Sequence, residues 1–335
     1  MELTTVWFDL IAVLWVGYFV LEGFDFGVGI LLPLLAKDER ERRVMINTIG
    51  PVWDGNEVWL LVAGGATFAA FPQWYATLFS GFYLPLLLIL VALIVRGVAF
   101  EYRAKQDSVA WRRAWDQAIF WGSLVPALLW GVAFANIVRG VPINAHLQYT
   151  GGFWGLLNPY ALLGGLTTLC LFVAHGAMFL ALKTDGPIRE RARQWALRRG
   201  LIAAVVTVVF LVWTQVRYGS VGSAILFVAA AIALVAGLLA ISRDREGWGF
   251  AGTFVAIGLG VVGLFATLFP NVMPTTLANG VSLTTTNASA THYTLQIMTV
   301  VAIVFTPLVL LYQAWTYWVF RKRIAVHHIP EGATH

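Results

Sequence analysis

The sequence predicts an all-α, polytopic membrane protein with about nine transmembrane helices. Hydrophobic residues make up 59% of its 335 residues and charged residues only 12%, whereas a soluble protein carries about 25% charged residues. A helix needs about 20 apolar residues to cross a bilayer, and apolar runs of that length recur along the chain. The 15 tryptophans fit two interfacial belts, where the amphipathic indole prefers to lie.

The apolar runs place the predicted spans in chain order. The first is long enough for a tilted or projecting helix, and no basic segment or cleavage site marks it as a signal peptide, so we expect a retained helix. The second is short, and Pro72 lies at its far end. The spans are residues 6–35, 55–71, 75–100, 115–138, 160–182, 200–217, 221–241, 249–269 and 294–320.

The distribution of Lys and Arg predicts the orientation. The segments after spans one, three, five, seven and nine hold most of these residues, whereas Arg139 and Arg217 lie at the opposite ends. By the positive-inside rule, the N-terminus is outside and the C-terminus is cytoplasmic. Because the basic residues lie in short loops between spans, the net charge of +5 does not indicate a nucleic-acid partner.

The best internal boundary is the loop at residues 140–159, with four predicted spans before it and five after it. We expect a single integral membrane domain in two parts, residues 1–140 and 141–335. Residues 271–293, rich in Thr, Asn and Ser, form a second outside loop. The apolar runs of spans six to eight contain no ionisable residue, so we expect the chemistry in spans one to three.

Two acids interrupt the first span, where a carboxylate facing lipid costs roughly 2.5–3.5 kcal/mol. Glu22 and Asp25 are three residues apart and share one face of a helix. Gly23 and Gly27 form a Gly-x-x-x-Gly pair that lets another backbone approach closely. The acids are either a proton-carrying pair at this contact or a structural pair bonded to a neighbouring Arg or indole.

Two further acids, Asp54 and Glu57, open the second span. Their Asp-x-x-Glu spacing just after Pro51 fits a capping box, in which Asp54 caps the first amides and Glu57 reaches back. Because the charge topology puts this helix start at the cytoplasmic face, the same pair also fits a proton entrance. The two roles are compatible.

Arg96 is the only basic residue inside an apolar run. It either neutralises one of the four acids or extends toward the cytoplasmic loop that begins near Glu101. Glu101 is its other candidate charge partner, although a spacing of five residues is not ideal on one helix.

Few residues of this chain suit metal or redox chemistry. His175 is the only histidine well inside a span, and a lone buried histidine is more often a hydrogen-bonded packing residue than a ligand. Cys170 is the only cysteine. The sequence lacks Cys-x-x-Cys, His-x-x-x-His, P-loop and nucleotide-binding motifs. We therefore expect no metal site and no catalytic residue in this chain.

Several motifs resemble those of subunit II of the cytochrome bd-type quinol oxidases, and the likeness runs essentially end to end. In the first half they are Gly23-Phe-Asp-Phe-Gly-Val-Gly29, Glu41-Arg-Arg-Val-Met-Ile-Asn47, Trp53-Asp-Gly-Asn-Glu-Val-Trp-Leu60 and Ala63-Gly-Gly-Ala-Thr-Phe-Ala-Ala70. Further matches are Ser80-Gly-Phe-Tyr83, Arg96-Gly-Val-Ala-Phe-Glu-Tyr-Arg103, Phe269-Pro-Asn-Val-Met-Pro274 and Leu310-Leu-Tyr-Gln-Ala-Trp-Thr-Tyr-Trp318.

The resemblance implies a fold, a location and a partner. The fold would be two four-helix bundles plus one peripheral helix, in the bacterial cytoplasmic membrane. Subunit I would form a heterodimer with this chain and carry two b-type haems and one d-type haem. The complex oxidises quinol, takes protons from the cytoplasm and reduces oxygen to water without pumping. Some relatives hold a structural quinone in this subunit, so a quinone or lipid is a candidate ligand of this chain, and small accessory subunits are candidate partners.

The resemblance also implies roles for single residues. Asp25 and Asp54 match acids of a cytoplasmic proton path, and Glu22 lies where relatives have another acid, so we expect a path through Asp54, Glu57, Asp25 and Glu22. Trp59 matches a position associated with an oxygen route or the subunit interface. Val52 departs from the pattern, because some relatives have His there.

Two rival interpretations come from other classes of protein. A proton-coupled secondary transporter would contain inverted repeats and broken helices, and the sequence shows no obvious repeat. A purely structural membrane scaffold would use its acids only to cap helices and to pair with Arg96.

Overall fold

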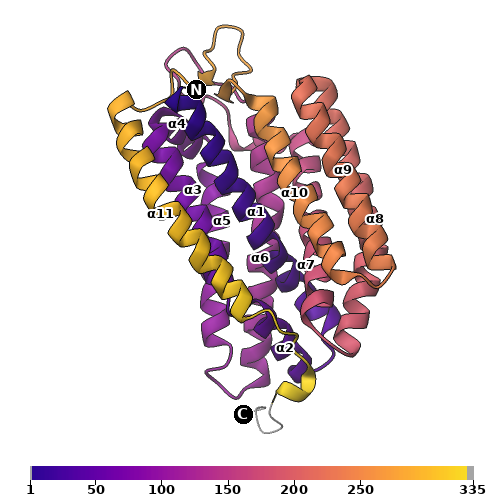
Figure 1. Cartoon of the computed structure of the whole chain (residues 1–335). Coiled ribbons are helices and arrows are strands. Elements are labelled where there is room, and N and C mark those ends of the chain that lie inside the picture. Colours follow the sequence, from indigo (N-terminus) through magenta and orange to yellow (C-terminus); the bar gives the residue numbers. More distant parts are fainter. Residues whose placement is uncertain (1, 330–335) are drawn as a thin grey trace.

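The computed structural model describes residues 2–329, in which almost all secondary structure is helical (Figure 1). The predicted all-α membrane class is confirmed, because eight of the eleven described α-helices are long and apolar enough to cross a membrane. These eight are α1 (Leu3–Leu35), α5 (Tyr83–Tyr102), α6 (Val109–Arg139), α7 (Pro159–Lys183), α8 (Pro187–Tyr218), α9 (Val221–Ser242), α10 (Glu246–Leu268) and α11 (His292–Val319). The others are α2 (Glu39–Ile49), α3 (Trp53–Ala70) and α4 (Pro72–Gly81), and short 3₁₀ turns lie at Phe153–Leu156 and Val326–His328.

Helix α3 corresponds to the predicted second span, although its polar first turn leaves it outside the group of eight. The Ala70 carbonyl at its end accepts a 2.8 Å hydrogen bond from the amide of Ala290, just before α11. Near its start, Asn56 accepts a bond from Tyr317, close to the other end of α11. Helix α3 therefore runs beside α11 for most of its length, which supports a ninth crossing.

The predicted third span, residues 75–100, is wrong as a single helix. The chain breaks at Phe82, between α4 and α5. Pro85 supplies the reason, because it has no amide hydrogen to donate to the carbonyl of Gly81 and its ring would clash with that carbonyl in a continuous helix.

Helix α1 lies in the middle of the molecule, against α3 and α6 on one side and α7 and α10 on the other (Figure 1). A Cβ atom on Gly27 would lie 2.8 Å from the Cα of Gly176 in α7. The predicted close backbone approach beside the acids is therefore confirmed, with α7 as the neighbour. The division of the chain at residues 140 and 141 stays a prediction.

Two loops pack together at the end of the molecule that holds the N-terminus (Figure 1). Strands β1 (Asn271–Met273) and β2 (Leu283–Thr284) pair as an antiparallel hairpin. The amide of Val141 donates to the carbonyl of Pro274 at 3.0 Å, which joins the two loops predicted on the outside. The last described α-helix, α11, ends at the opposite end of the molecule (Figure 1).

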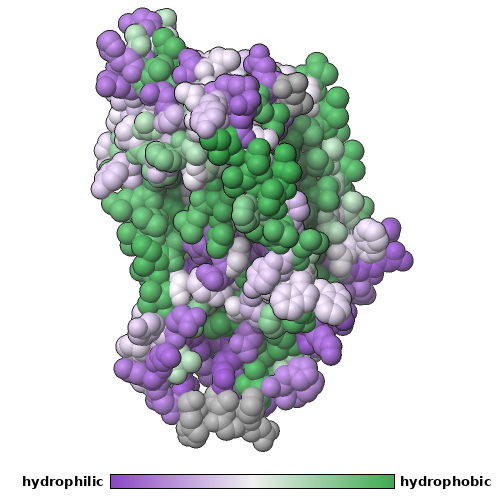
Figure 2. All heavy atoms as spheres, turned by 60° about the vertical axis from the view of Figure 1, so that its left-hand side comes forward, coloured by the Kyte–Doolittle hydropathy of each residue, from purple (hydrophilic) through white to green (hydrophobic). Residues whose placement is uncertain are grey.

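The surface carries an apolar band between two hydrophilic ends (Figure 2). Helix α11 contributes to this band from the edge of the bundle, since Leu295 is its only buried residue. It packs chiefly on α1 and α3. Its position matters because its inner face bonds to Asn56 and Trp59 of α3, which flank Glu57 in the sequence.

Candidate functional site

A single guanidinium lies at the centre of the buried polar side chains. Arg96, on α5, is fully buried. It forms an ion pair with Glu22 of α1 and a longer one, at 3.5 Å, with Glu57 of α3. The rings of Phe26 and Phe100 lie 4.8 Å and 5.3 Å from the guanidinium carbon. In the structure Arg96 thus pairs with two of the four acids, Glu22 and Glu57.

The alternative, that Arg96 extends to the cytoplasmic loop, is wrong. Helix α6 covers its stem, because a Cβ on Gly122 would lie only 2.7 Å from the Cβ of Arg96. Glu101, its other candidate partner, is exposed and forms no ion pair within residues 2–329. The packing of α6 against α5 therefore keeps the cation inside.

The second acid of α1, Asp25, is bonded to an amide. Asn56 Nδ2 donates to Asp25 Oδ2 at 2.7 Å. Asn56 Oδ1 accepts from Tyr317 Oη at 2.7 Å and from Gln313 Nε2 at 3.2 Å. Gln313 Oε1 accepts from Trp59 Nε1 at 2.8 Å. These hydrogen bonds link α1, α3 and α11.

Glu22, Asp25, Glu57 and Arg96 form what we call the acid–arginine cluster. It contains three carboxyl groups and one cation. Unpaired buried charges cost several kcal/mol each, so a neutral cluster requires protons on two of the three carboxyls. Glu22 Oε2 and Asp25 Oδ1 have no hydrogen-bond partner among the described residues. The cluster can therefore hold and release protons.

The acids differ in burial, from Asp54 and Glu57 on α3 to Glu22 on α1. Asp54 is exposed, the Glu57 side chain is 18% exposed, and Glu22 is fully buried.

The predicted capping box is wrong. Helix α3 begins at Trp53, with Val52 in the capping position and no side-chain cap. Glu57 therefore lies too far along the helix to accept a bond from the amide at the capping position, and its side chain pairs with Arg96 instead.

A second ionic cluster lies beyond Arg96 along α5. Arg103 bonds to Asp116 of α6 at 2.6 Å and to Glu39 of α2 at 2.7 Å and 2.8 Å. Burial alone raises the pKa of Glu39, but the hydrogen bonds and charge of Arg103 outweigh burial and hold it below its ordinary value. This cluster joins α2, α5 and α6 and was missed from the sequence.

His175 behaves as the predicted packing residue. Its Nδ1 lies 2.6 Å from Thr253 Oγ1, and its Nε2 lies 3.1 Å from the Val20 carbonyl. Its ring stacks on Phe250, with 4.5 Å between centroids. Both ring nitrogens are occupied, so this side chain does not fit the role of a haem ligand.

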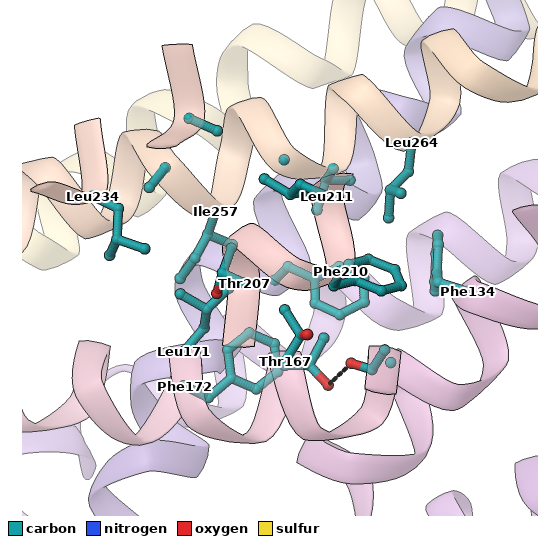
Figure 3. A pocket seen from close by; sticks show the side chains of 18 residues that line it. Phe134, Thr167, Leu171, Phe172, Thr207, Phe210, Leu211, Leu234, Ile257 and Leu264 are labelled. Atoms are coloured by element: carbon teal, nitrogen blue, oxygen red, sulfur yellow. Dashed lines mark hydrogen bonds between the residues drawn. The ribbon is translucent and has the colours of Figure 1, made fainter. Parts of the chain in front are cut away.

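An apolar cavity of about 60 Å³ lies between α1 and helices α6 to α10 (Figure 3). Phe134, Phe172, Phe210 and Leu264 are among its walls, and no member of the acid–arginine cluster lines it. Pockets for drug-sized ligands measure about 300–1,000 Å³. The cavity therefore suits a small apolar molecule and is too small for a quinone ring.

Three polar residues around Asp25 were missed from the sequence: Asn56, Gln313 and Tyr317. Asn56 stands between Asp54 and Glu57, so its place in the acidic motif was one signal. Gln313 and Tyr317 are four residues apart on one face of a membrane helix. A polar pair at that spacing in an apolar run was the other signal.

Comparison with known proteins gives a consistent result. Residues 3–320 match the family model of cytochrome bd terminal oxidase subunit II. The chain is 43% identical over 333 residues to cytochrome bd ubiquinol oxidase subunit 2 of Bacillus subtilis (strain 168), which covers 97% of each chain. It is 38% identical over 370 residues to cytochrome bd-I ubiquinol oxidase subunit 2 of Escherichia coli (strain K12), which covers 98% of this chain and 97% of that protein.

A likeness of fold extends to a solved structure, the bd oxidase from Geobacillus thermodenitrificans. The TM-score is 0.77 at 18% sequence identity, and the match covers 96% of this chain and 100% of that chain. At this identity the match concerns the fold alone.

The substitution Arg96→Met should destabilise the protein by roughly 3–5 kcal/mol, because it leaves buried carboxyls without their cation. Thermal unfolding of the detergent-purified protein measures the effect. Adding Glu22→Gln should restore part of the loss, since that carboxyl then no longer needs a counter-charge. Arg139→Met is the matched control at an exposed position. Equal unfolding temperatures for Arg96→Met and wild type would rule out the cluster as a structural centre.

The Glu39–Arg103 pair should make stability depend on pH. A carboxyl whose pKa is lowered on folding stabilises the protein above its unfolded pKa of about 4.5, and this stabilisation is lost as the pH falls through the folded value. Glu39→Gln should therefore lower the unfolding temperature at neutral pH, and the difference should vanish in acid. Glu101→Gln, at an exposed acid, is the control. A difference that persisted at acidic pH would contradict the role given to Arg103.

Proposed function

The chain belongs to the cytochrome bd terminal oxidase subunit II family, and we propose that its acid–arginine cluster is the inner part of a path that carries protons into the oxidase. The family makes the chain a subunit of a bacterial membrane oxidoreductase that forms a complex with subunit I. Family membership gives no support to the transporter considered from the sequence.

The observation that carries the proposal is the gradient of exposure along the acids. Asp54 is exposed at the start of α3, Glu57 is partly exposed one turn further, and Glu22 is fully buried with Asp25. Each position offers a carboxyl group, which both accepts and donates a proton. A proton taken up at Asp54 can therefore pass inward by short steps, with Arg96 stabilising the charge left behind.

The distribution of charge supports a cytoplasmic start for this path. The start of α3 lies at the same end of the molecule as α2 (Figure 1), and basic residues are concentrated in the segments at that end. By the positive-inside rule this is the cytoplasmic end. A path from there would supply the protons that the reduction of oxygen to water consumes.

Haems belong to the partner subunit in this proposal. The family implies them there, and we propose the two b-type haems and one d-type haem that the sequence resemblance implies. The histidine well inside a span of this chain supports this assignment, because both ring nitrogens of His175 already have hydrogen-bond partners. No step of the proton path involves a haem within this chain.

Further partners follow from the same resemblance. Quinol would be oxidised by the complex, and small accessory subunits and membrane lipids would contact its outer surface. A structural quinone or lipid bound to this chain would lie on the apolar exterior, since the cavity between α1 and helices α6 to α10 holds only about 60 Å³. Trp59 lies between Gly17 of α1 and Gln313 of α11, and we propose that it forms part of an oxygen route or of the subunit interface.

A second candidate function is that of a structural scaffold. The ion pairs of Arg96 with Glu22 and Glu57 favour it, because they join three helices whether or not protons move. The two functions differ in their consequences. A scaffold whose acids are changed loses stability and haem, whereas a proton path loses turnover while the haems stay bound.

The substitution Asp25→Asn in the intact oxidase should lower quinol-driven oxygen consumption at least tenfold, since a positioned proton-transfer group contributes roughly 10²–10⁴-fold. Asp54→Asn should lower it less, because water can replace an exposed acid. Haem content, read from the reduced-minus-oxidised spectrum, should stay at the wild-type level. Asp9→Asn, an exposed acid on the same helix, is the control. Full oxygen consumption in Asp25→Asn with the haems retained would contradict the proposed proton path. Loss of haem from this variant would favour the structural scaffold.

A further inference from the structure

The hydrogen bonds from Trp59 to Asp25 have only one possible direction. The indole Nε1 of Trp59 can only donate, so the atom of Gln313 that faces it is the oxygen. The amide nitrogen of Gln313 then faces Asn56 Oδ1, and the hydroxyl of Tyr317 points to the same oxygen. Two donors at Oδ1 leave Asn56 with its nitrogen toward Asp25.

This orientation distinguishes the two oxygens of Asp25. Oδ2 accepts the 2.7 Å bond from Asn56, and a proton on Oδ2 would compete with that N–H for the same space. Oδ1 has no hydrogen-bond partner among the described residues, and neither has Glu22 Oε2. Glu22 and Asp25 are three residues apart on α1, so the two carboxyl groups are neighbours on one face of the helix. Two carboxylate oxygens can be joined only by a proton.

We propose that Asn56, held by Gln313 and Tyr317, is a positioning residue that directs the exchangeable proton of Asp25 to Oδ1, the oxygen that Asn56 leaves free. This inference rests on the proposed proton path and adds to it which oxygen of Asp25 carries the proton. Helix α11, at the edge of the bundle (Figure 1), thereby controls which oxygen of Asp25 carries the proton.

Four titratable or charged groups surround Asp25. They come from four helices: Glu22 of α1, Glu57 of α3, Arg96 of α5 and Tyr317 of α11. Changing Gln313 and Tyr317 leaves the two other carboxyls and the guanidinium in place. Tyr317→Phe alone leaves the bond between Trp59 and Gln313 in place, so its effect on proton transfer comes through Asn56.

The test is the double substitution Tyr317→Phe with Gln313→Leu in the intact oxidase, read as the pH profile of quinol-driven oxygen consumption. Without its two donors, Asn56 no longer keeps its N–H on Asp25. Because that N–H stabilises the carboxylate more than the acid, the profile should move by about one pH unit to higher pH. Haem content should be unchanged. Tyr312→Phe removes an exposed hydroxyl from the same helix and should leave the profile in place.

A profile that coincides with wild type in the double variant would overturn the inference. Should the double variant lose haem, the single substitution Tyr317→Phe keeps the ring and carries the test, with a smaller shift in the same direction expected and no shift overturning the inference. The two proposals are contradicted by different results. If Asp25→Asn is inactive but the pH profile of the double variant is unshifted, the proton path is supported and only the role of Asn56 is wrong. Full activity in Asp25→Asn contradicts the proton path itself.

Discussion

The placement of one guanidinium among two fully buried carboxyl groups and one partly exposed one is the constraint on which the rest of the structure depends. Arg96 compensates one charge, and its partners Glu22 and Glu57 come from α1 and α3. Three helices must therefore keep their relative positions for any of these groups to stay buried. Because one cation cannot neutralise three acids, the same arrangement that holds the helices together also requires bound protons. Stability and proton binding share a single set of residues.

Small residues bring the helices close enough for this arrangement. Gly27, two residues from Asp25, lets α1 approach α7 at Gly176, and Gly122 lets α6 cover the stem of Arg96. A side chain at either glycine would separate the helices. The polar and the steric features thus act together: the glycines exclude water and lipid, and exclusion strengthens the electrostatic interactions within the cluster.

The sequence was sufficient for features that depend on one helix at a time. Apolar runs predicted the class, the spacing of Glu22 and Asp25 predicted a shared face, and Gly27 predicted a close contact. Features that depend on the contact between two helices, or on where one helix begins, were harder to predict from the sequence. The partner of Arg96 was left open, since α5 and α1 are far apart in sequence. The prediction that Asp54 caps a helix was wrong because α3 already begins at Trp53.

The contact between Asn56 and Tyr317 was missed altogether, because 261 residues separate them and no periodicity connects them. Infrared difference spectroscopy of the intact oxidase, between acid and alkaline buffers, tests most directly whether the cluster holds exchangeable protons. We expect a protonated-carboxyl band that shifts in D₂O and is lost or displaced in both Glu22→Gln and Asp25→Asn. Spectra in which neither substitution alters a protonated-carboxyl band would contradict a proton-holding cluster.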